Sequence, residues 1–219
     1  MCALKILFIT SNVHKFREVQ DIVRNISRRS DIEISHLPLK YPEIQHEEIE
    51  FVAKSAAYFI MKECYVSEPF FLEDSGLFIP ALKGFPGAFS SFVFSKIGNE
   101  GILKLMSGLE GDERRAFFKS VIAFSSSSHA SNSSRSYDFF DICSDARAHN
   151  CMPAPGDVKI FVGITEGRIA DSERGSGGFG FDPIFEYKGK TFAEMTTEEK
   201  NSVSHRGKAV RKFIDYLIG

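Results

Sequence analysis

Residues 5–26 read KILFITSNVHKFREVQDIVRNI and predict a strand, a tight turn and a helix. The apolar run at residues 5–10 is typical of a buried strand. Ser11 and Asn12 interrupt this run, and such residues can cap a helix. Apolar residues then recur at helical spacing up to residue 26. A unit of this kind predicts that the chain opens as part of an α/β fold.

The pattern beyond this unit predicts more strands than helices. We expect strands at residues 32–37, 70–72, 115–124, 158–165 and 167–169, the last two joined by a turn at Glu166 and Gly167. We expect helices near residues 49–60, 89–97, 99–106 and 209–217, with Gly98 ending the second of them. Strands and helices alternate early and strands dominate later, so the fold class is α/β with a mixed β-sheet.

The composition is that of an ordinary globular chain of 219 residues, with 43% hydrophobic and 26% charged residues. A net charge of -2 disfavours non-specific nucleic-acid binding, so no nucleic acid is expected as a partner. No apolar run is long enough to span a bilayer and no secretory signal is evident, which predicts a cytoplasmic protein with no membrane partner. The four cysteines match no zinc spacing and indicate free thiols.

Residues 125–156 differ from the rest because they are rich in serine and contain SSSSHASNSS and PAPG. We interpret them as a surface insertion between two strands of a single domain that spans residues 1–219. A plain insertion is favoured over a functional lid.

Thr10, Ser11, Asn12 and Lys15 form the first motif with chemical potential. The N-terminus of a helix offers free N–H groups and a partial positive charge, which together favour phosphate binding. Lys15 in the first turn adds a full charge. Taken alone, however, the motif favours a plain capped helix with a solvated lysine.

Glu73, Asp74, Ser75 and Gly76 form the second motif, predicted at the C-terminal end of a buried strand. Ligands of open α/β sheets gather at such ends, where two carboxylates can hold a divalent cation or activate water. Neighbours in a regular strand point to opposite faces, so only one carboxylate would face a cleft unless the chain has already turned. A polar turn is an equally good interpretation of these four residues alone.

Residues 175–185 form a glycine-rich third motif, GSGGFGFDPIF. The accidental GxGxxG pattern does not indicate a dinucleotide site, because the following Phe-Asp-Pro cannot open a helix cleanly. A pliable loop is the better interpretation, in which Phe179 and Phe181 stack on a base and Asp182 hydrogen-bonds its edge. The competing interpretation places these phenylalanines in the core.

Lys200, His205 and Arg206 form a fourth, cationic motif before the last helix. Arginine suits bidentate phosphate contacts, and lysine acts as a point charge. The alternative is a solvated, charged helix start. Glu43 precedes the second predicted helix and Lys54 lies within it, and neither residue alone indicates a site.

Taken together, these segments resemble the inosine triphosphate pyrophosphatase family, and most closely its archaeal-type members. The matching segments run in the family's order over nearly the whole chain. They are ITSNVHKFREV, YPEIQ, FLEDSGLFIPALKGFPGAFSSFV, GNEGILKL, GSGGFGFDPIF and TFAEMTTEEKNSVSHR.

This resemblance implies a long mixed sheet with flanking helices, in two lobes around a central cleft, and a homodimer that uses Mg²⁺, with Mn²⁺ as a substitute. It implies that Asp74 is the general base and that Glu43, Glu73 and Asp74 bind the metal. The substrate-binding residues that it implies are Thr10, Asn12, Lys15, Lys54, Ser75, Phe179, Asp182, Lys200, His205 and Arg206. Three residues depart from the family's usual ones, since Ser11 replaces glycine and Phe89 and Phe181 replace tyrosine or tryptophan.

The expected function is hydrolysis of deaminated purine triphosphates (ITP, dITP and XTP) to the monophosphate and pyrophosphate. One alternative is a pyrophosphatase that acts on pyrimidine or other modified nucleotides. Another is a nucleotide-binding module without catalytic activity.

Overall fold

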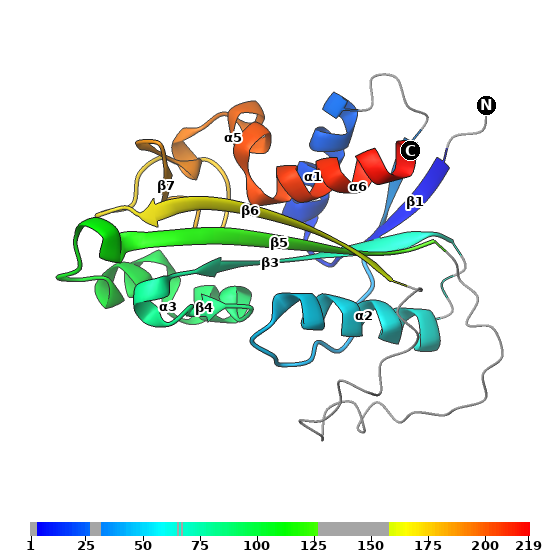
Figure 1. Cartoon of the computed structure of the whole chain (residues 1–219), viewed down its shortest axis with the longest axis horizontal. Helices are drawn as coiled ribbons and strands as arrows, with labels where there is room; N and C mark the ends of the chain where they lie inside the picture. Colours follow the sequence, from blue (N-terminus) through cyan, green and yellow to red (C-terminus); the bar gives the residue numbers. More distant parts are fainter. Residues whose placement is uncertain (1–3, 27–31, 65, 67, 127–157) are drawn as a thin grey trace.

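A mixed β-sheet organises the computed structural model, which describes residues 4–26, 32–64, 66, 68–126 and 158–219. The eight strands of this described part have the order β2-β1-β3-β5-β6-β7-β8, and β4 pairs with β3 (Figure 1). They are β1 (Leu4–Ile9), β2 (Ile32–Leu37), β3 (Phe70–Phe78), β4 (Pro86–Gly87), β5 (Arg115–Ser125), β6 (Lys159–Ile169), β7 (Phe185–Tyr187) and β8 (Lys190–Thr191). Strands β2, β1 and β3 run parallel and the other pairings are antiparallel, which confirms the predicted mixed sheet.

Helices cover both faces of the sheet (Figure 1). They are α1 (Val13–Ile26), α2 (Ile49–Glu63), α3 (Ser90–Leu105), α5 (Thr197–Val203) and α6 (His205–Ile218). Helices α1 and α6 lie on one face, and α2 lies on the other (Figure 1). We call the first the α6 face and the second the α2 face.

The buried side chains form one hydrophobic cluster on each face and a third cluster at the far end of the long strands. Phe71 and Ile122 pack in the α6-face cluster, whereas Leu72 and Val121 pack in the α2-face cluster. The third cluster gathers residues of β3, α3, β5, β6 and the segment after them. The long sheet and its flanking helices are as predicted, whereas the cleft between two lobes stays a prediction.

Two strands run further than the sequence pattern predicted. Strand β3 does not end at Glu73 but continues to Phe78, paired with β5 along its whole length. Strand β6 has no turn at Glu166 and Gly167 and continues to Ile169. A Cβ at residue 167 would lie 2.4 Å from the carbonyl oxygen of Glu186, so this glycine permits the close approach of β7 instead of a turn.

Other expectations have mixed outcomes. Gly98 has φ 59° and kinks α3 where a break was predicted. A capping box of Thr196 and Glu199 begins α5. Residues 127–156 of the predicted insertion lie outside the described residues. No helix in the described part of the chain is long and apolar enough to cross a membrane.

Candidate active site

The edge of β3 that lies next to β1 has a gap in its pairing. Strand β1 pairs with Phe70 and Phe71, and β4 pairs with Leu77 and Phe78 on the same edge. Residues 72–76 have no strand partner there among the described residues, because β1 stops before them and β4 begins after them. We call this segment the open edge of β3. It contains the whole second motif of the sequence.

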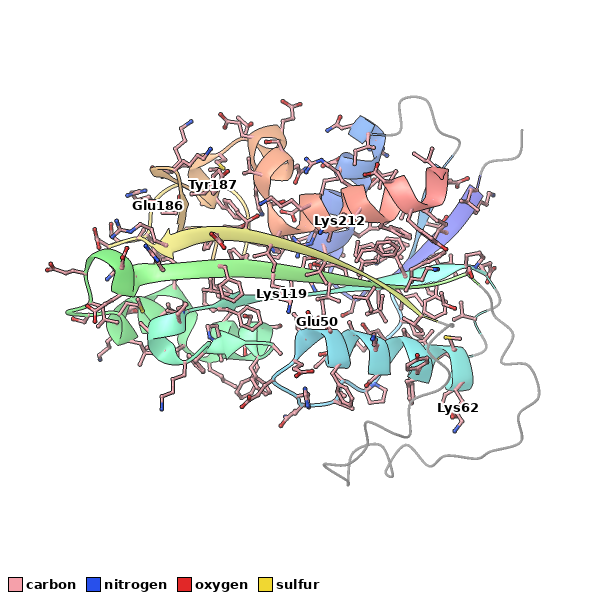
Figure 2. The ribbon with its side chains drawn as sticks, viewed as in Figure 1. Glu50, Lys62, Lys119, Glu186, Tyr187 and Lys212 are labelled. Atoms are coloured by element: carbon pink, nitrogen blue, oxygen red, sulfur yellow. The ribbon has the colours of Figure 1, made fainter. Side chains whose placement is uncertain are left out.

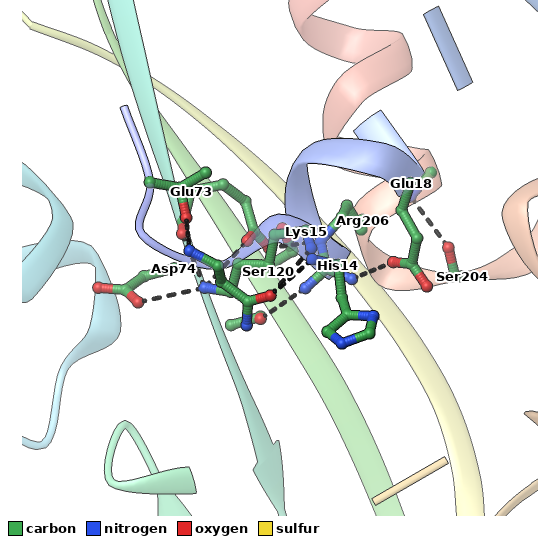
Figure 3. A network of polar contacts seen from close by, with 12 residues as sticks. His14, Lys15, Glu18, Glu73, Asp74, Ser120, Ser204 and Arg206 are labelled. Carbon is green, nitrogen blue, oxygen red and sulfur yellow. Dashed lines mark hydrogen bonds and ion pairs between the residues drawn. The ribbon is translucent and has the colours of Figure 1, made fainter. Parts of the chain in front are cut away.

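Lys15 of α1 occupies the open edge. Its ammonium donates a hydrogen bond to the carbonyl oxygen of Glu73 at 2.9 Å. This bond replaces the one that the backbone of a neighbouring strand would otherwise donate. The same ammonium lies 3.2 Å from Glu73 Oε2 and 3.7 Å from Asp74 Oδ1. The first and second motifs of the sequence therefore meet at one point, although 58 residues separate Lys15 from Glu73 (Figure 3).

The turn before α1 holds Lys15 in place. Asn12 Oδ1 accepts hydrogen bonds from the backbone N–H groups of His14 and Lys15, at 2.9 and 3.2 Å, and so caps the helix. Thr10 Oγ1 in turn accepts from the Asn12 N–H at 3.1 Å, and the Thr10 carbonyl oxygen lies 2.8 Å from His36 Nε2. In this structure Thr10 and Asn12 shape the turn beside the open edge.

Glu73 and Asp74 lie on opposite faces of the sheet, as neighbours in a regular strand must. Glu73 shares the α6 face with Phe71, and Asp74 shares the α2 face with Leu72. The Glu73 side chain is fully buried, whereas that of Asp74 keeps 23% of its exposure. Asp74 is therefore the carboxylate of the pair that solvent and a ligand can reach.

Glu73 is surrounded by donors on the α6 face. Ser120 donates to Glu73 Oε1 at 2.6 Å, and Arg206 Nε lies 3.3 Å from the same oxygen. Burial raises the pKa of Glu73, but the charges of Arg206 and Lys15 outweigh it and bring that pKa down to about 2. Arg206 also donates to Ser75 Oγ at 2.9 Å, so two predicted site residues are joined directly.

Glu18 extends this network toward the third and fourth motifs. Its carboxylate pairs with Arg206 and lies 2.5 Å from Lys200 Nζ. Lys200 Nζ also lies 2.7 Å from Asp182 Oδ2. Burial raises the pKa of Glu18, but Arg206 and Lys200 hold it below its ordinary value. We call Glu18, Glu73, Asp182, Lys200 and Arg206 the buried charge network.

Phe179 lies at the edge of this network, beside a pocket of about 280 Å³. Its ring packs against the His14 ring at a centroid distance of 5.5 Å, and the Lys200 ammonium lies 5.0 Å from its centroid. The Phe179 N–H donates to Asp182 Oδ2 at 2.7 Å, which fixes the loop. Residues from α1, from the glycine-rich loop, from the segment before α5 and from α5 line the pocket: His14, Arg17, Glu18, Asp21, Gly177, Gly178, Phe179, Phe192, Met195, Thr197 and Lys200.

His205 and Phe181 are placed in the interior. The His205 ring stacks on Phe118 at 4.5 Å and does not line the pocket. Burial, and after it the charge of Arg206, lowers the pKa of His205 well below its ordinary value, so the ring is neutral. Phe181 is buried in the third cluster and meets Phe94 edge to face, so of the two loop phenylalanines only Phe179 is half-exposed.

The α2 face carries the remaining predicted residues. Burial, and then the charge of Asp74, raises the pKa of Glu43, which places these two carboxylates in one electrostatic environment. Burial also raises the pKa of Asp74. The charge of Lys15 lowers this pKa and the charge of Glu73 raises it, and the result is a pKa above the ordinary value. Lys54 on α2 is half-buried and makes no hydrogen bond or ion pair with any described residue.

A model of the Ham1 family matches residues 6–216 of this chain. The chain belongs to the Ham1 family. It is 46% identical over 216 residues to the dITP/XTP pyrophosphatase of Pyrococcus horikoshii, covering 98% of this chain and 97% of that protein. It is 41% identical to the dITP/XTP pyrophosphatase of Methanosarcina mazei, with 98% of each chain covered. The solved HAM1 protein of Coxiella burnetii superposes with a TM-score of 0.71 at 29% identity, over 98% of both chains.

In this Ham1 family chain the oxygen atoms around the Lys15 ammonium are also suitable ligands for a metal ion. Glu73 contributes its carbonyl oxygen and Oε2, and Asp74 contributes Oδ1, so an ammonium is already held by three oxygens. Hard divalent cations prefer such oxygen ligands. Among the described residues, however, no three His, Cys, Asp or Glu side chains are grouped so that they could hold an ion by themselves.

Sequence reasoning missed two residues of the site, Glu18 and Ser120. Glu18 follows Lys15 by three residues and therefore lies on the same helix face, which was an available signal. Ser120 had no such signal, since it becomes a partner of Glu73 only through the pairing of β3 with β5.

Proposed function

We propose that this chain hydrolyses ITP, dITP and XTP to the monophosphate and pyrophosphate. One observation carries the proposal: the partly exposed Asp74 carboxylate lies beside the Lys15 ammonium at the open edge of β3. The archaeal relatives named dITP/XTP pyrophosphatase cover nearly the whole of this chain and support the same reaction.

The triphosphate carries a high negative charge, which cations must neutralise before a nucleophile can approach. We assign this task to Lys15, Lys54 and the partial positive charge at the start of α1. Asp74 orients a water molecule and takes its proton as the water oxygen attacks the α-phosphorus. The bond from that phosphorus to the bridging oxygen breaks, and pyrophosphate leaves.

Glu43, Glu73 and Asp74 would hold a Mg²⁺, with Mn²⁺ as a substitute, and would do so together with the substrate, because their side chains do not form a complete metal site by themselves. Burial is the first cause of the raised pKa values of Asp74 and Glu43, and the charge of Asp74 adds to the rise at Glu43. These raised pKa values support the assignment, because a nearby cation would favour the ionised form of both carboxyl groups. When bound, the ion would neutralise charge on the phosphate oxygens.

We place the base in the pocket beside Phe179, whose half-exposed ring can stack on a purine. Lys200 lines that pocket and is held rigidly by Glu18 and Asp182, which makes it the donor to the oxygen at position six. Adenine presents an amine at that position, so two donors would face each other. Such a mismatch costs about 1–3 kcal/mol, and several contacts are needed for strong rejection of ATP.

The proposal is tested by measuring pyrophosphate release from ITP, XTP, dUTP and ATP, with and without Mg²⁺. We expect ITP and XTP to be cleaved much faster than ATP and dUTP, and only in the presence of the ion. Equal rates for ITP and ATP would contradict the assigned selectivity. Binding of ITP without pyrophosphate release would indicate a nucleotide-binding module.

We also propose that the enzyme is a homodimer that acts in the cytoplasm, where the nucleotide pool is held, and that it has no nucleic-acid partner. The net charge of -2 supports the last point. Size-exclusion chromatography with light scattering tests the dimer.

A further inference from the structure

Lys119 of β5 is a charged residue on the α2 face that the proposed mechanism does not use. It lies directly opposite Gly76 of β3, while Asp74 lies opposite Val121. Residues opposite each other in an antiparallel pair share a face, so Lys119 and Asp74 are diagonal neighbours on one face. Gly76, the next residue of β3 on that face, has no side chain, and the carbonyl oxygen of Gly87 packs 2.2 Å from where its Cβ would lie.

Glu50 of α2 holds Lys119 as an ion pair across the space between helix and sheet (Figure 2). The Lys119 side chain keeps 20% of its exposure and that of Glu50 keeps 34%, so solvent reaches both. No other ion pair to Lys119 is present among the described residues. Its ammonium is therefore retained by a single, accessible carboxylate, unlike the cations of the buried charge network.

The placement of this pair suits a polyanion at Asp74. Phosphate groups attached to a phosphorus next to Asp74 extend beyond it, and Lys119 lies one strand away on the same face. A phosphate oxygen can replace the Glu50 carboxylate as the acceptor for the ammonium, because both are anionic oxygens and lysine is a flexible point charge. Lys54 lies one helical turn after Glu50 on α2 and points to the same side of the helix.

We propose that Lys119 is a further phosphate-binding residue, and that Glu50 is a positioning residue that holds Lys119 until the triphosphate replaces it. This inference rests on the proposed function, since it assumes that the phosphates lie at Asp74. The competing explanation is that the pair only fastens α2 to β5. The two explanations predict opposite effects of Glu50 on phosphate binding. If Glu50 competes with phosphate for Lys119, it weakens binding; if the ion pair only stabilises the packing of α2 on β5, Glu50 supports binding.

Binding of inorganic pyrophosphate, measured by calorimetry in the presence of Mg²⁺, separates the two explanations. We expect Lys119→Gln to weaken binding roughly tenfold to a hundredfold, the usual worth of a charged hydrogen bond. Lys119→Arg should keep most of the affinity. Glu50→Gln should strengthen binding about twofold to fivefold, because it removes a weak competing ion pair.

A double variant and a charge control complete the test. In the Lys119→Gln background, Glu50→Gln should change affinity by less than about twofold, because its effect passes through Lys119. Glu47→Gln changes the net charge equally in the exposed segment before α2 and should also have little effect. Weaker binding by Glu50→Gln, or unchanged binding by Lys119→Gln in a variant with wild-type unfolding, would overturn the proposal.

Failure of the proposed function gives a different result. A wild-type protein that binds pyrophosphate through Lys119 but releases none from ITP or XTP would refute the hydrolysis and retain the Lys119 site. In an active enzyme, Lys119→Gln should raise KM for ITP while Lys119→Arg restores it. A purely structural ion pair would not make KM depend on the charge of residue 119 in this way.

Discussion

The charged side chains on the two faces of β3 differ in burial and in pairing. On the α6 face, Glu73 is fully buried and meets Ser120, Arg206 and Lys15. On the α2 face, Asp74 is partly exposed, Lys54 has no partner among the described residues, and the raised pKa of Asp74 indicates incomplete compensation. Adjacent residues of one strand thus belong to a closed structural network and to a surface that can accept charge.

This difference separates stability from turnover. A buried, paired charge is costly to disturb, since removing one partner leaves the other without compensation. A partly exposed carboxylate with a raised pKa contributes little to folding and is available for proton transfer. The α6 face therefore supports the site, and we expect the chemistry to take place on the α2 face.

The largest expected effect is that of Asp74→Asn on turnover. Loss of a general base should lower kcat about 10²–10⁴-fold while the nucleotide still binds. Because burial and Glu73 raise the pKa of Asp74, the neutral amide should not lower the free energy of unfolding. Pyrophosphate release and urea titration measure the two quantities, and near-normal turnover would exclude Asp74 as the base.

Glu73→Gln should have a large effect on stability, unlike Asp74→Asn. Arg206 would lose a buried partner, so we expect a loss of about 3–5 kcal/mol in the free energy of unfolding at neutral pH. The folded pKa of about 2 is below the ordinary value of 4.5, so this stability is present above pH 4.5 and is lost as the pH falls toward 2. The difference between wild type and variant should shrink over the same window; a constant difference would argue against the ionised pair.

Ser120→Ala tests the same face with a smaller change. The variant removes the hydroxyl that donates to Glu73 and leaves its other partners in place. We expect a loss of about 1.5–3 kcal/mol in the free energy of unfolding, the usual worth of a hydrogen bond to a charged group. Ser202→Ala, at an exposed serine of α5, is the matched control and should change stability by less than about 0.5 kcal/mol.

The smallest expected effect is a shift in the pH dependence of activity. Lys15 lowers the pKa of Asp74, so Lys15→Gln should move the acid limb of kcat/KM to higher pH. Residual activity of the variant, measured between pH 4 and 9, checks this. An acid limb that moves to lower pH would contradict the contact between these two side chains.

The sequence predicted the elements well and their lengths less well. Periodicity located α1, β2 and the closing helix because each buries one regular apolar face. The run Glu73 to Gly76 resembled a turn because it is polar. It remains strand because partners distant in sequence, Lys15 and Arg206, compensate its charges, and no local pattern contains that information.

The identity of several site residues was likewise predictable from local sequence, whereas their accessibility and charge state were not. The motifs supplied Lys15, Asp74 and Arg206, whose chemistry is apparent from residue type and spacing. Which of two adjacent carboxylates would stay accessible depended on the sheet register, and the neutrality of His205 depended on its burial among aromatic rings. These properties arise only once the strands have paired.

The open edge of β3 makes strand length itself a determinant of the chemistry. The position of the reactive groups is defined by where β1 and β4 stop pairing with β3. If β1 were extended by two or three residues, its backbone would take the carbonyl of Glu73 and displace Lys15. A change in residue count near residue 10 could therefore abolish activity while every side chain discussed above was retained.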